Sequence, residues 1–438
     1  MTGTGELYSA LFGDEGTAAH LSDAAEVAAM ARVEAALARA QADTGVIPPE
    51  AAEAIARVCT GFRPDMAALA AATGRNGVPV PGLVEALRAA GVAAGEEEAM
   101  RWLHWGATSQ DIMDTALALR LRAMFDLWDG RLAALLALLG EQAERHADLP
   151  MVARTYGQAA VPTSFGVVAT GWGRPVMRQR SRLAALRADV LKVSLSGAAG
   201  TLAAMGPRGP EVRARLAALL GLEDPATSWH SERDGIGALA AWMAGTTTQL
   251  GRMGEDLAVM AQTGFGEVAI AGAGASSTMP QKQNPVGPSA LVALARQAGA
   301  LAAAVQGAGL HRQARDGAAW FTEWLCLPPL ALACGRALSL ACDVAVAVRP
   351  DAAAMARGLA ADGGLILAER LTFRLATSMP RDRAAAAVKA LCARVRAGEG
   401  SLPDLAAAAF PGLGALIPDL GTAPDEARAF AAMVRALD

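Results

Sequence analysis

Apolar residues recur at helical spacing along most of this chain, and the pattern is strongest in five long segments. Helices of about 20 residues or more exceed the usual mean length and are typical of a helix bundle. Period-two alternation is nearly absent, so few strands are expected. The pattern therefore predicts an all-α fold. The five segments cover residues 126–147, 164–193, 233–262, 286–307 and 320–347.

Shorter helical segments flank the five long ones. Ser22 is placed to cap a helix that ends near Gly45, and another helix is expected to open near Ser109. After Pro350 the helical segments shorten and prolines return. We therefore expect three consecutive parts. They are an N-terminal helical domain at 1–108, a central long-helix bundle at 109–348 and a small C-terminal helical domain at 349–438.

Composition and charge bound the class of protein. The 438 residues are 53% hydrophobic, yet no apolar run of about 18 residues lacks glycine, charged or polar interruptions. The first residues lack the basic and apolar regions of a secretory signal, and the formal charge of −4 argues against a nucleic-acid partner. We expect a soluble, cytoplasmic protein without membrane contact, whose surplus apolar surface is buried in an obligate oligomer.

The cysteines and histidines give no sign of a metal site. The five cysteines are odd in number and contain no CxxC, and the five histidines show no pair at ligand spacing. Cys326, Cys334 and Cys342 recur every eight residues within a helical pattern, as small buried hydrophobic residues do. We expect reduced thiols and no metal ion.

One polar stretch, from Gly274 to Pro285, interrupts the alanine-rich background most strongly. It contains two adjacent serines, Ser276 and Ser277, followed by Lys282 and Asn284. Glycines at its start let such a segment move, whereas its two prolines restrict the backbone. A hydroxyl beside a cation is what proton abstraction next to a carboxylate requires. An ordinary surface loop is the alternative, and it explains this combination of residues less well.

A second polar stretch runs from His104 to Asp111. Thr108 or Ser109 is placed to cap the following helix, and the free N–H groups of a helix start favour a carboxylate ligand. Plain helix capping is the alternative. The presence of His104 and Gln110 beside the cap favours a site, because the whole chain has only five histidines.

Three further polar segments are weaker candidates, at residues 154–163, 229–234 and 311–316. The first could be a structural turn, the second a solvated helix cap and the third ordinary surface charge. Each nevertheless places polar side chains in an apolar setting. The candidate ligands that they supply are Tyr156, Gln158, His230, Arg233 and Arg315.

Together these segments resemble conserved blocks of the fumarase/aspartase superfamily. Residues 276–285 resemble its signature loop, 104–111 its second block and 154–163 its third. Segments 23–48, 104–115, 229–234 and 276–285 are most similar to a bacterial cycloisomerase branch of that superfamily. The resemblance implies interconversion of 3-carboxy-cis,cis-muconate and 4-carboxymuconolactone, a step of aromatic catabolism in the protocatechuate branch of the β-ketoadipate pathway. It also implies a homotetramer with a twenty-helix core, active sites shared between subunits, and no metal or organic cofactor.

The resemblance also implies roles for individual residues. Ser276 would be the acid or base that handles the α-proton, with His104 as a candidate second catalytic group. Lys282 and Asn284 would hold a substrate carboxylate. The other candidate substrate ligands are Thr108, Ser109, Tyr156, Gln158, His230, Arg233, Ser277 and Arg315.

The chain departs from related families at several positions. Adenylosuccinate lyases carry histidine where Tyr156 stands and glutamate where Ser289 stands, a pair that serves a strongly basic leaving group. A carboxylate leaves without protonation, so a cycloisomerase can dispense with this pair. Other cycloisomerases of the superfamily show histidines near Gln281, Gln313 and Phe321, and this chain has none there.

Other functions fit parts of the same sequence. A β-eliminating lyase acting on nitrosuccinate, adenylosuccinate or argininosuccinate is the main alternative within the superfamily. A serine hydrolase is disfavoured because the segment around Ser276 lacks the closing glycine of a nucleophile elbow and no strand precedes it. A non-catalytic helical scaffold is disfavoured because Ser276, Lys282 and Asn284 are all present.

Overall fold

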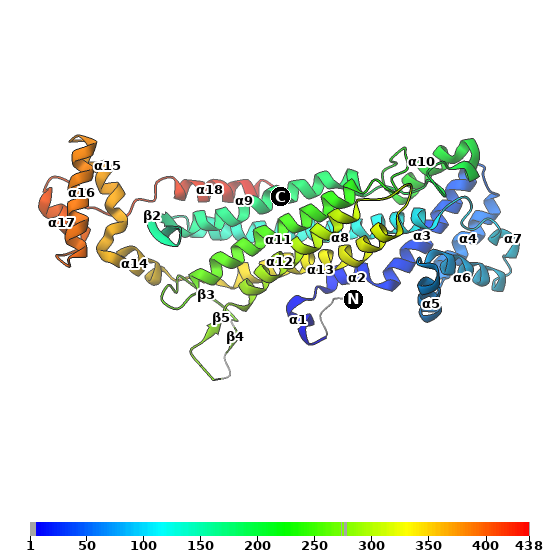
Figure 1. The fold of residues 1–438 in the computed structure, drawn as a ribbon, viewed down its shortest axis with the longest axis horizontal. Helices are drawn as coiled ribbons and strands as arrows, with labels where there is room; N and C mark the ends of the chain where they lie inside the picture. The colour runs from blue at the N-terminus through cyan, green and yellow to red at the C-terminus, as the bar shows by residue number, and fades with distance from the viewer. Residues whose placement is uncertain (1–5, 273, 276–277, 438) are drawn as a thin grey trace. The chain divides into compact units, whose positions relative to one another are not determined.

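The computed structural model describes residues 6–272, 274–275 and 278–437, and helices make up most of it (Figure 1). The long helices confirm the all-α bundle predicted from the apolar pattern. The longest, α8, runs unbroken for 37 residues, where the pattern predicted two separate segments. The five longest helices are α8 (Ser109–Arg145), α9 (Phe165–Val190), α11 (Asp234–Met260), α12 (Val286–Ala308) and α13 (Gly317–Ala347).

Shorter helices precede and connect the long ones. α3 (Asp23–Asp43) begins as expected, with the Ser22 hydroxyl accepting a hydrogen bond from the backbone N–H of Ala25. α3 supplies several buried side chains to the site described below. The other helices before α11 are η1 (Glu6–Tyr8), α1 (Ser9–Phe12), α2 (Glu15–Leu21), α4 (Pro49–Gly61), α5 (Met66–Asn76), α6 (Val80–Ala93), α7 (Glu97–Met100), η2 (Ala203–Arg208) and α10 (Gly209–Leu220).

Small antiparallel sheets are the feature that the apolar pattern did not predict. The largest is a hairpin of β1 (Pro150–Thr155) and β2 (Gln158–Ser164), and it includes the segment 154–163, for which a structural turn was one of two interpretations. Its two turn residues, Tyr156 and Gly157, have φ of 53° and 72°, the left-handed backbone that a two-residue hairpin turn requires. The other pairs are β3 (Val268–Ile270) with β6 (Val348–Pro350), and β4 (Gly274–Ala275) with β5 (Gln283–Asn284).

Contacts between Cα atoms divide the chain into two compact units, and each unit is built from three segments. The long helices contribute to both units, whereas the three expected domains are consecutive in sequence. That three-part division therefore stays a prediction. Unit 1 comprises Met1–Gly130, Gln179–Thr247 and Leu294–Ala337, and unit 2 comprises Arg131–Arg178, Thr248–Ala293 and Leu338–Asp438.

Within unit 2, the residues of the predicted C-terminal domain, 349–438, do not all pack into one separate core. Most of their helices share a buried apolar core, which also takes in Val152 of β1. α18 (Ala423–Arg435) instead lies against helices α8 and α9, where Arg435 pairs with Glu144 and Phe430 packs on Gly173. The helices of the shared core are α14 (Ala352–Ala360), η3 (Ala361–Leu367), α15 (Ala368–Leu375), α16 (Arg381–Arg396) and α17 (Leu402–Ala409).

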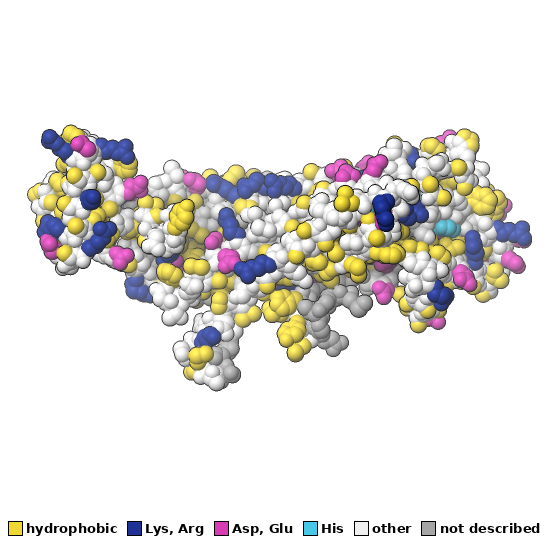
Figure 2. Space-filling view, viewed as in Figure 1, with side chains coloured by type: hydrophobic (Ala, Val, Ile, Leu, Met, Phe, Trp, Pro, Cys, Tyr) yellow, Lys and Arg dark blue, Asp and Glu magenta, His cyan; other side chains and the backbone are white. Residues whose placement is uncertain are grey.

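Two helices, α12 and α13, are long and apolar enough to cross a membrane by length and composition. The core helices of a soluble protein pass the same test. In α13, 67% of the most apolar window is buried within the chain, against 39% in α12. Apolar side chains also remain on the surface in Figure 2, and on α13 Leu325 is 75% exposed. Exposed apolar side chains of this kind can be buried by association with other chains.

The core of unit 1 depends on a close helix contact at Gly335. The Trp128 ring is fully buried, stacks on Trp242 with ring centroids 5.7 Å apart, and donates from Nε1 to the Thr17 hydroxyl at 3.2 Å. Gly335 of α13 lies against Thr17, because a Cβ at position 335 would lie 2.1 Å from the Thr17 hydroxyl oxygen. Only glycine therefore fits at this point of α13.

We expect Gly335→Ala to lower the free energy of unfolding by about 1–3 kcal/mol, because the added methyl group forces Thr17 to move within a packed core. The matched control is Gly130→Ala in α8, where a Cβ meets nothing within 4 Å. That change should raise stability by about 0.5–1 kcal/mol. Thermal unfolding of both variants measures the difference, and equal melting temperatures would contradict the proposed close contact.

Candidate functional site in unit 1

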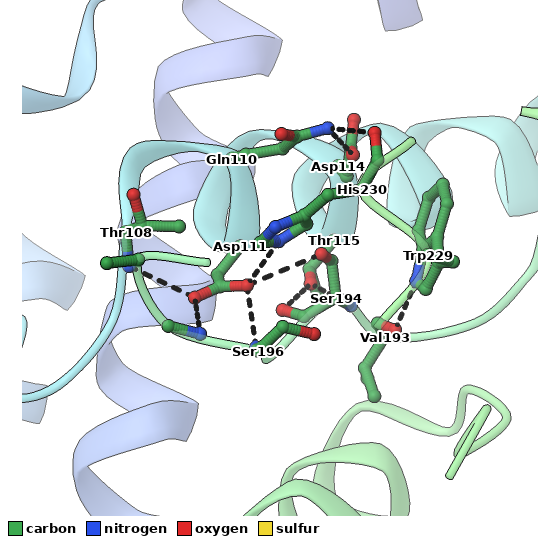
Figure 3. A network of polar contacts seen from close by, with 12 residues as sticks. Thr108, Gln110, Asp111, Asp114, Thr115, Val193, Ser194, Ser196, Trp229 and His230 are labelled. Carbon is green, nitrogen blue, oxygen red and sulfur yellow. Dashed lines mark hydrogen bonds and ion pairs between the residues drawn. The ribbon is translucent and has the colours of Figure 1, made fainter. Parts of the chain in front are cut away.

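A buried carboxylate organises the start of α8. Asp111 has no exposed surface, and its two oxygens accept hydrogen bonds from three segments of unit 1 (Figure 3). A carboxylate surrounded by this many donors stays bound in place. The donors are the backbone N–H of Thr108 at 3.0 Å, of Ser196 at 2.8 Å and of Gly197 at 3.0 Å, His230 Nε2 at 2.8 Å and the Ser194 hydroxyl at 3.5 Å.

The start of α8 lies where the sequence predicted a helix start, with Asp111 in the first turn. The N–H of Thr108, the residue before the helix, donates to Asp111. The side-chain hydroxyls of Thr108 and Ser109 have no hydrogen-bond partner among the described residues, and both residues are half-buried. These hydroxyl groups are donors that unit 1 offers to a ligand here, and carboxylate binding by the helix start stays a prediction.

His230 and Gln110 connect α8 to the segment that precedes α11. The buried His230 ring donates to Asp111, and the Gln110 amide donates to the His230 carbonyl oxygen at 2.8 Å (Figure 3). The Gln110 oxygen accepts from Arg315 Nε at 2.7 Å. These contacts place the half-buried Arg315 beside the start of α8. They also make His230 a structural support of this region, and its role as a substrate ligand stays a prediction.

Arg233 belongs to a buried ion cluster. Its side chain is 1% exposed, and it donates to Asp114 at 2.8 and 3.2 Å and to Glu323 at 2.6 and 3.0 Å. Burial lowers the pKa of Arg233, but the two carboxylates outweigh burial and raise it above its usual value. Burial raises the pKa of Glu323, against the opposing charge of Arg233. Arg233 therefore pairs with two buried carboxylates, and its role as a substrate ligand stays a prediction.

His104 lies in the loop before α8 and is held there by α3. Its backbone has φ of 62°, and its Nδ1 lies 2.6 Å from Oε1 of Glu34 on α3. Burial lowers the pKa of His104, but the charge and hydrogen bond of Glu34 and the charge of Asp111 outweigh burial and raise it overall. The His104 side chain is 19% exposed, and its other ring nitrogen has no hydrogen-bond partner among the described residues.

The remaining predicted site residues belong to unit 2. Tyr156 and Gln158 lie at the exposed tip of the β1–β2 hairpin, Lys282 is exposed, and Asn284 lies on β5 opposite Gly274. Arg154 anchors the hairpin, because both of its terminal nitrogens donate to Glu267 at 2.9 Å. The predicted residues Ser276 and Ser277 lie outside the described residues.

The predicted set is thus divided between the two units. His104, Thr108, Ser109 and Arg315 gather around the start of α8 in unit 1. Sequence reasoning missed the buried acidic residues that organise this region. The signal available was a set of acidic residues at inward positions of helices that are otherwise apolar. These residues are Glu34, Asp111, Asp114 and Glu323.

The structure is thus an all-helical scaffold with a candidate polar site at the start of its longest helix. The chain belongs to the lyase family of the fumarase/aspartase superfamily, because the lyase family model matches residues 6–299. This family assignment agrees with the superfamily resemblance of the sequence.

Individual relatives and solved structures show which members of the family this chain is similar to. The 3-carboxy-cis,cis-muconate cycloisomerase of Bradyrhizobium diazoefficiens is 40% identical over 86% of this chain and 84% of its own. The nitrosuccinate lyase of Streptomyces davaonensis is 40% identical over 81% of this chain and 76% of its own. The crystal structure of the 3-carboxy-cis,cis-muconate lactonizing enzyme of Pseudomonas putida matches with a TM-score of 0.93 and 35% identity, over 98% of this chain and 99% of its own.

We expect Arg233→Met to lower the free energy of unfolding by about 3–5 kcal/mol near neutral pH, because Asp114 and Glu323 then lose their buried counter-ion. Unpaired buried carboxylates have folded-state pKa values above their unfolded values. The variant therefore recovers stability as the pH falls and both groups take up protons.

Urea unfolding at about pH 8 and about pH 5.5 measures this effect. Arg312→Met is the matched control, since Arg312 pairs with Asp316 but its side chain is 83% exposed, and little change is expected. Adding Asp114→Asn and Glu323→Gln to Arg233→Met should restore much of the lost stability. A loss that does not depend on pH would contradict the charge argument.

Proposed function

We propose that this protein is a cycloisomerase that interconverts 3-carboxy-cis,cis-muconate and 4-carboxymuconolactone. The observation that carries the proposal is the match to the lactonizing enzyme of Pseudomonas putida over 98% of the chain. Four relatives named 3-carboxy-cis,cis-muconate cycloisomerase, at 35–40% identity, support it. Ser276, Lys282 and Asn284 supply the chemistry that such a reaction requires.

The proposed reaction forms one C–O bond and one C–H bond. An oxygen of one substrate carboxylate attacks a double bond that is conjugated to a second carboxylate, at the carbon β to that second group. The π electrons of this double bond then move onto the second carboxylate. Lys282 and Asn284, with the hydroxyls of Thr108 and Ser109, stabilise the resulting aci-carboxylate. Ser276 then delivers a proton to the α-carbon, and it removes that proton in the reverse direction.

A serine hydroxyl is too weak a base by itself, so nearby donors and the closing of the segment over the anionic ligand must activate it. Ser277, Gln158, Tyr156 and Arg315 complete the proposed substrate ligands. His104 is the proposed second acid–base group; burial lowers its pKa, but the charges of Glu34 and Asp111 outweigh burial and raise it. No metal or organic cofactor takes part in this proposal.

The proposed active form is a cytoplasmic homotetramer whose sites take residues from several subunits. Exposed apolar side chains on the long helices support association, for example Leu325 at 75% and Val346 at 55% exposure on α13. The partners in this proposal are a small polycarboxylate and other copies of the chain.

A β-eliminating lyase is the second candidate function. The nitrosuccinate lyase of Streptomyces davaonensis is 40% identical to this chain, over 81% of the chain against 86% for the Bradyrhizobium diazoefficiens cycloisomerase. Nitrite is a weak base and leaves without protonation, as a carboxylate does. The absence of histidine at Tyr156 and of glutamate at Ser289 fits both candidates and disfavours lyases that release amines.

We expect Ser276→Ala to reduce kcat for 3-carboxy-cis,cis-muconate by about 10²- to 10⁴-fold, because the proton donor to the α-carbon is lost. Loss of the conjugated-diene absorbance measures the rate. Ser289→Ala is the matched control: it removes an exposed hydroxyl on α12 for which the reaction has no use, so activity should remain.

Nitrosuccinate, argininosuccinate and adenylosuccinate are assayed in parallel. Turnover of one of these, without turnover of the muconate, would replace the cycloisomerase by a lyase. Near-normal activity of Ser276→Ala on whichever substrate is turned over would refute the role of Ser276.

Shared sites predict complementation between two inactive variants. We expect His104→Gln and Ser276→Ala each to be weakly active alone, and their co-expression to recover part of the wild-type activity. Hybrid tetramers then contain some sites in which His104 comes from one subunit and Ser276 from another. Recovery is measured as kcat per chain in the purified mixture. No recovery in tetramers proven to contain both variants would place the two residues of each site on one chain.

A further inference from the structure

One face of α3 carries two buried polar side chains that both reach the loop before α8. Glu34 and Gln41 lie seven residues apart, about two helical turns, and each is 1% exposed. Glu34 Oε1 lies 2.6 Å from His104 Nδ1, and the Gln41 amide donates to the Trp105 carbonyl oxygen at 2.7 Å. α3 therefore holds this loop by a charged contact at one residue and a neutral contact at the next.

The backbone of His104 needs such support. A φ of 62° is uncommon for a residue with a side chain and costs on the order of 1 kcal/mol or more. Gly106, with φ of 71°, packs so closely on Met205 that a Cβ would lie 2.8 Å from it. The loop is thus fixed on both sides of Trp105, and the His104 ring is turned toward Glu34.

Among the described residues, His104 is the ion-pair partner of Glu34. The second oxygen of Glu34, Oε2, is buried and has no hydrogen-bond partner among the described residues. The nearby Cys59 thiol stays neutral and adds no charge, because burial and the Glu34 charge raise its pKa to about 12. An ionised Glu34 in this position therefore depends on the His104 ring for its charge balance.

The charged groups that act on His104 are Glu34, Asp111 and Arg88. Burial of the ring and Arg88 oppose protonation, whereas Glu34 and Asp111 favour it, and the pKa of His104 is raised overall. Since Nδ1 is occupied by Glu34, Nε2 is the nitrogen left for a ligand, and it has no partner among the described residues. A protonated ring presents Nε2–H as a cationic donor.

We propose that Glu34 is a positioning residue that holds His104 as an imidazolium, with Nε2–H directed to a carboxylate of the substrate. The inference rests on the proposed function, in which His104 is the second acid–base group. Glu34 touches no substrate itself and acts through the ring. Its buried charge, in place of a neutral acceptor, is the feature that determines the protonation state of His104 near neutral pH.

Glu34→Gln tests this proposal, because it keeps the shape and a neutral acceptor but removes the charge. The basic limb of the kcat/KM–pH profile should move to lower pH, with kcat/KM at about pH 7.5 falling on the order of tenfold. Glu34→Asp, which keeps the charge, should leave the limb near its wild-type position. Gln41→Met removes the neutral anchor of the same loop and should not move the limb.

Titration of ¹³Cε1-labelled histidines by NMR, with His104 assigned through His104→Gln, follows the ring without substrate. His104 of the wild-type protein should titrate above the ordinary value of 6.5, and in Glu34→Gln it should titrate at lower pH. Titration of wild-type His104 at or below 6.5 would overturn the proposal even if Glu34→Gln fails to fold. An unchanged titration in a folded Glu34→Gln would overturn it as well.

The NMR result separates this proposal from the proposed function. If His104 titrates as expected but the muconate is not turned over, the role of Glu34 stands and the cycloisomerase fails. Adding Glu34→Gln to His104→Gln should cause no further loss of kcat/KM, since Glu34 acts only through the ring. A further loss in the double variant would show that Glu34 has an independent structural effect.

Discussion

The buried carboxylate of Asp111 is the interaction on which the geometry of the candidate site depends. It joins the first turn of α8, the backbone at Ser196 and Gly197, and the ring of His230, which lie far apart in the sequence. A carboxylate held by five donors is stable in a buried setting, whereas any of these donors left alone would be costly. The hydroxyls of Thr108 and Ser109 are positioned by this network.

The polar and charged side chains of unit 1 form two groups, a buried cluster that supports the fold and partly exposed residues suited to bind a ligand. Arg233 and its two carboxylates are closed to solvent and pair with one another, so they connect the segment before α11 to α8 and α13. His104 and Arg315 are partly exposed, and each is tied to a buried neighbour. Partly exposed donors held in this way are suited to an anionic substrate, because little ordering remains to be done on binding.

The sequence predicted the helices well, because their apolar periodicity sustains itself over more than 20 residues in each. It also located His104, Thr108 and Ser109, which stand out as polar residues in an apolar background. The roles of His230 and Arg233 could not be inferred, since their partners lie about 90 to 120 positions away. The β1–β2 hairpin was missed because its alanines and bulged register leave no clear alternation.

The central claim is that this scaffold adds a carboxylate to a double bond and protonates the carbon next to another carboxylate. The most direct measurement is the reaction of 3-carboxy-cis,cis-muconate in D₂O, followed by ¹H NMR. The account predicts 4-carboxymuconolactone with a single deuterium on the newly protonated α-carbon, next to the carboxylate that carried the charge of the intermediate. Unchanged muconate, while a succinate adduct is converted to fumarate by the same protein, would contradict it.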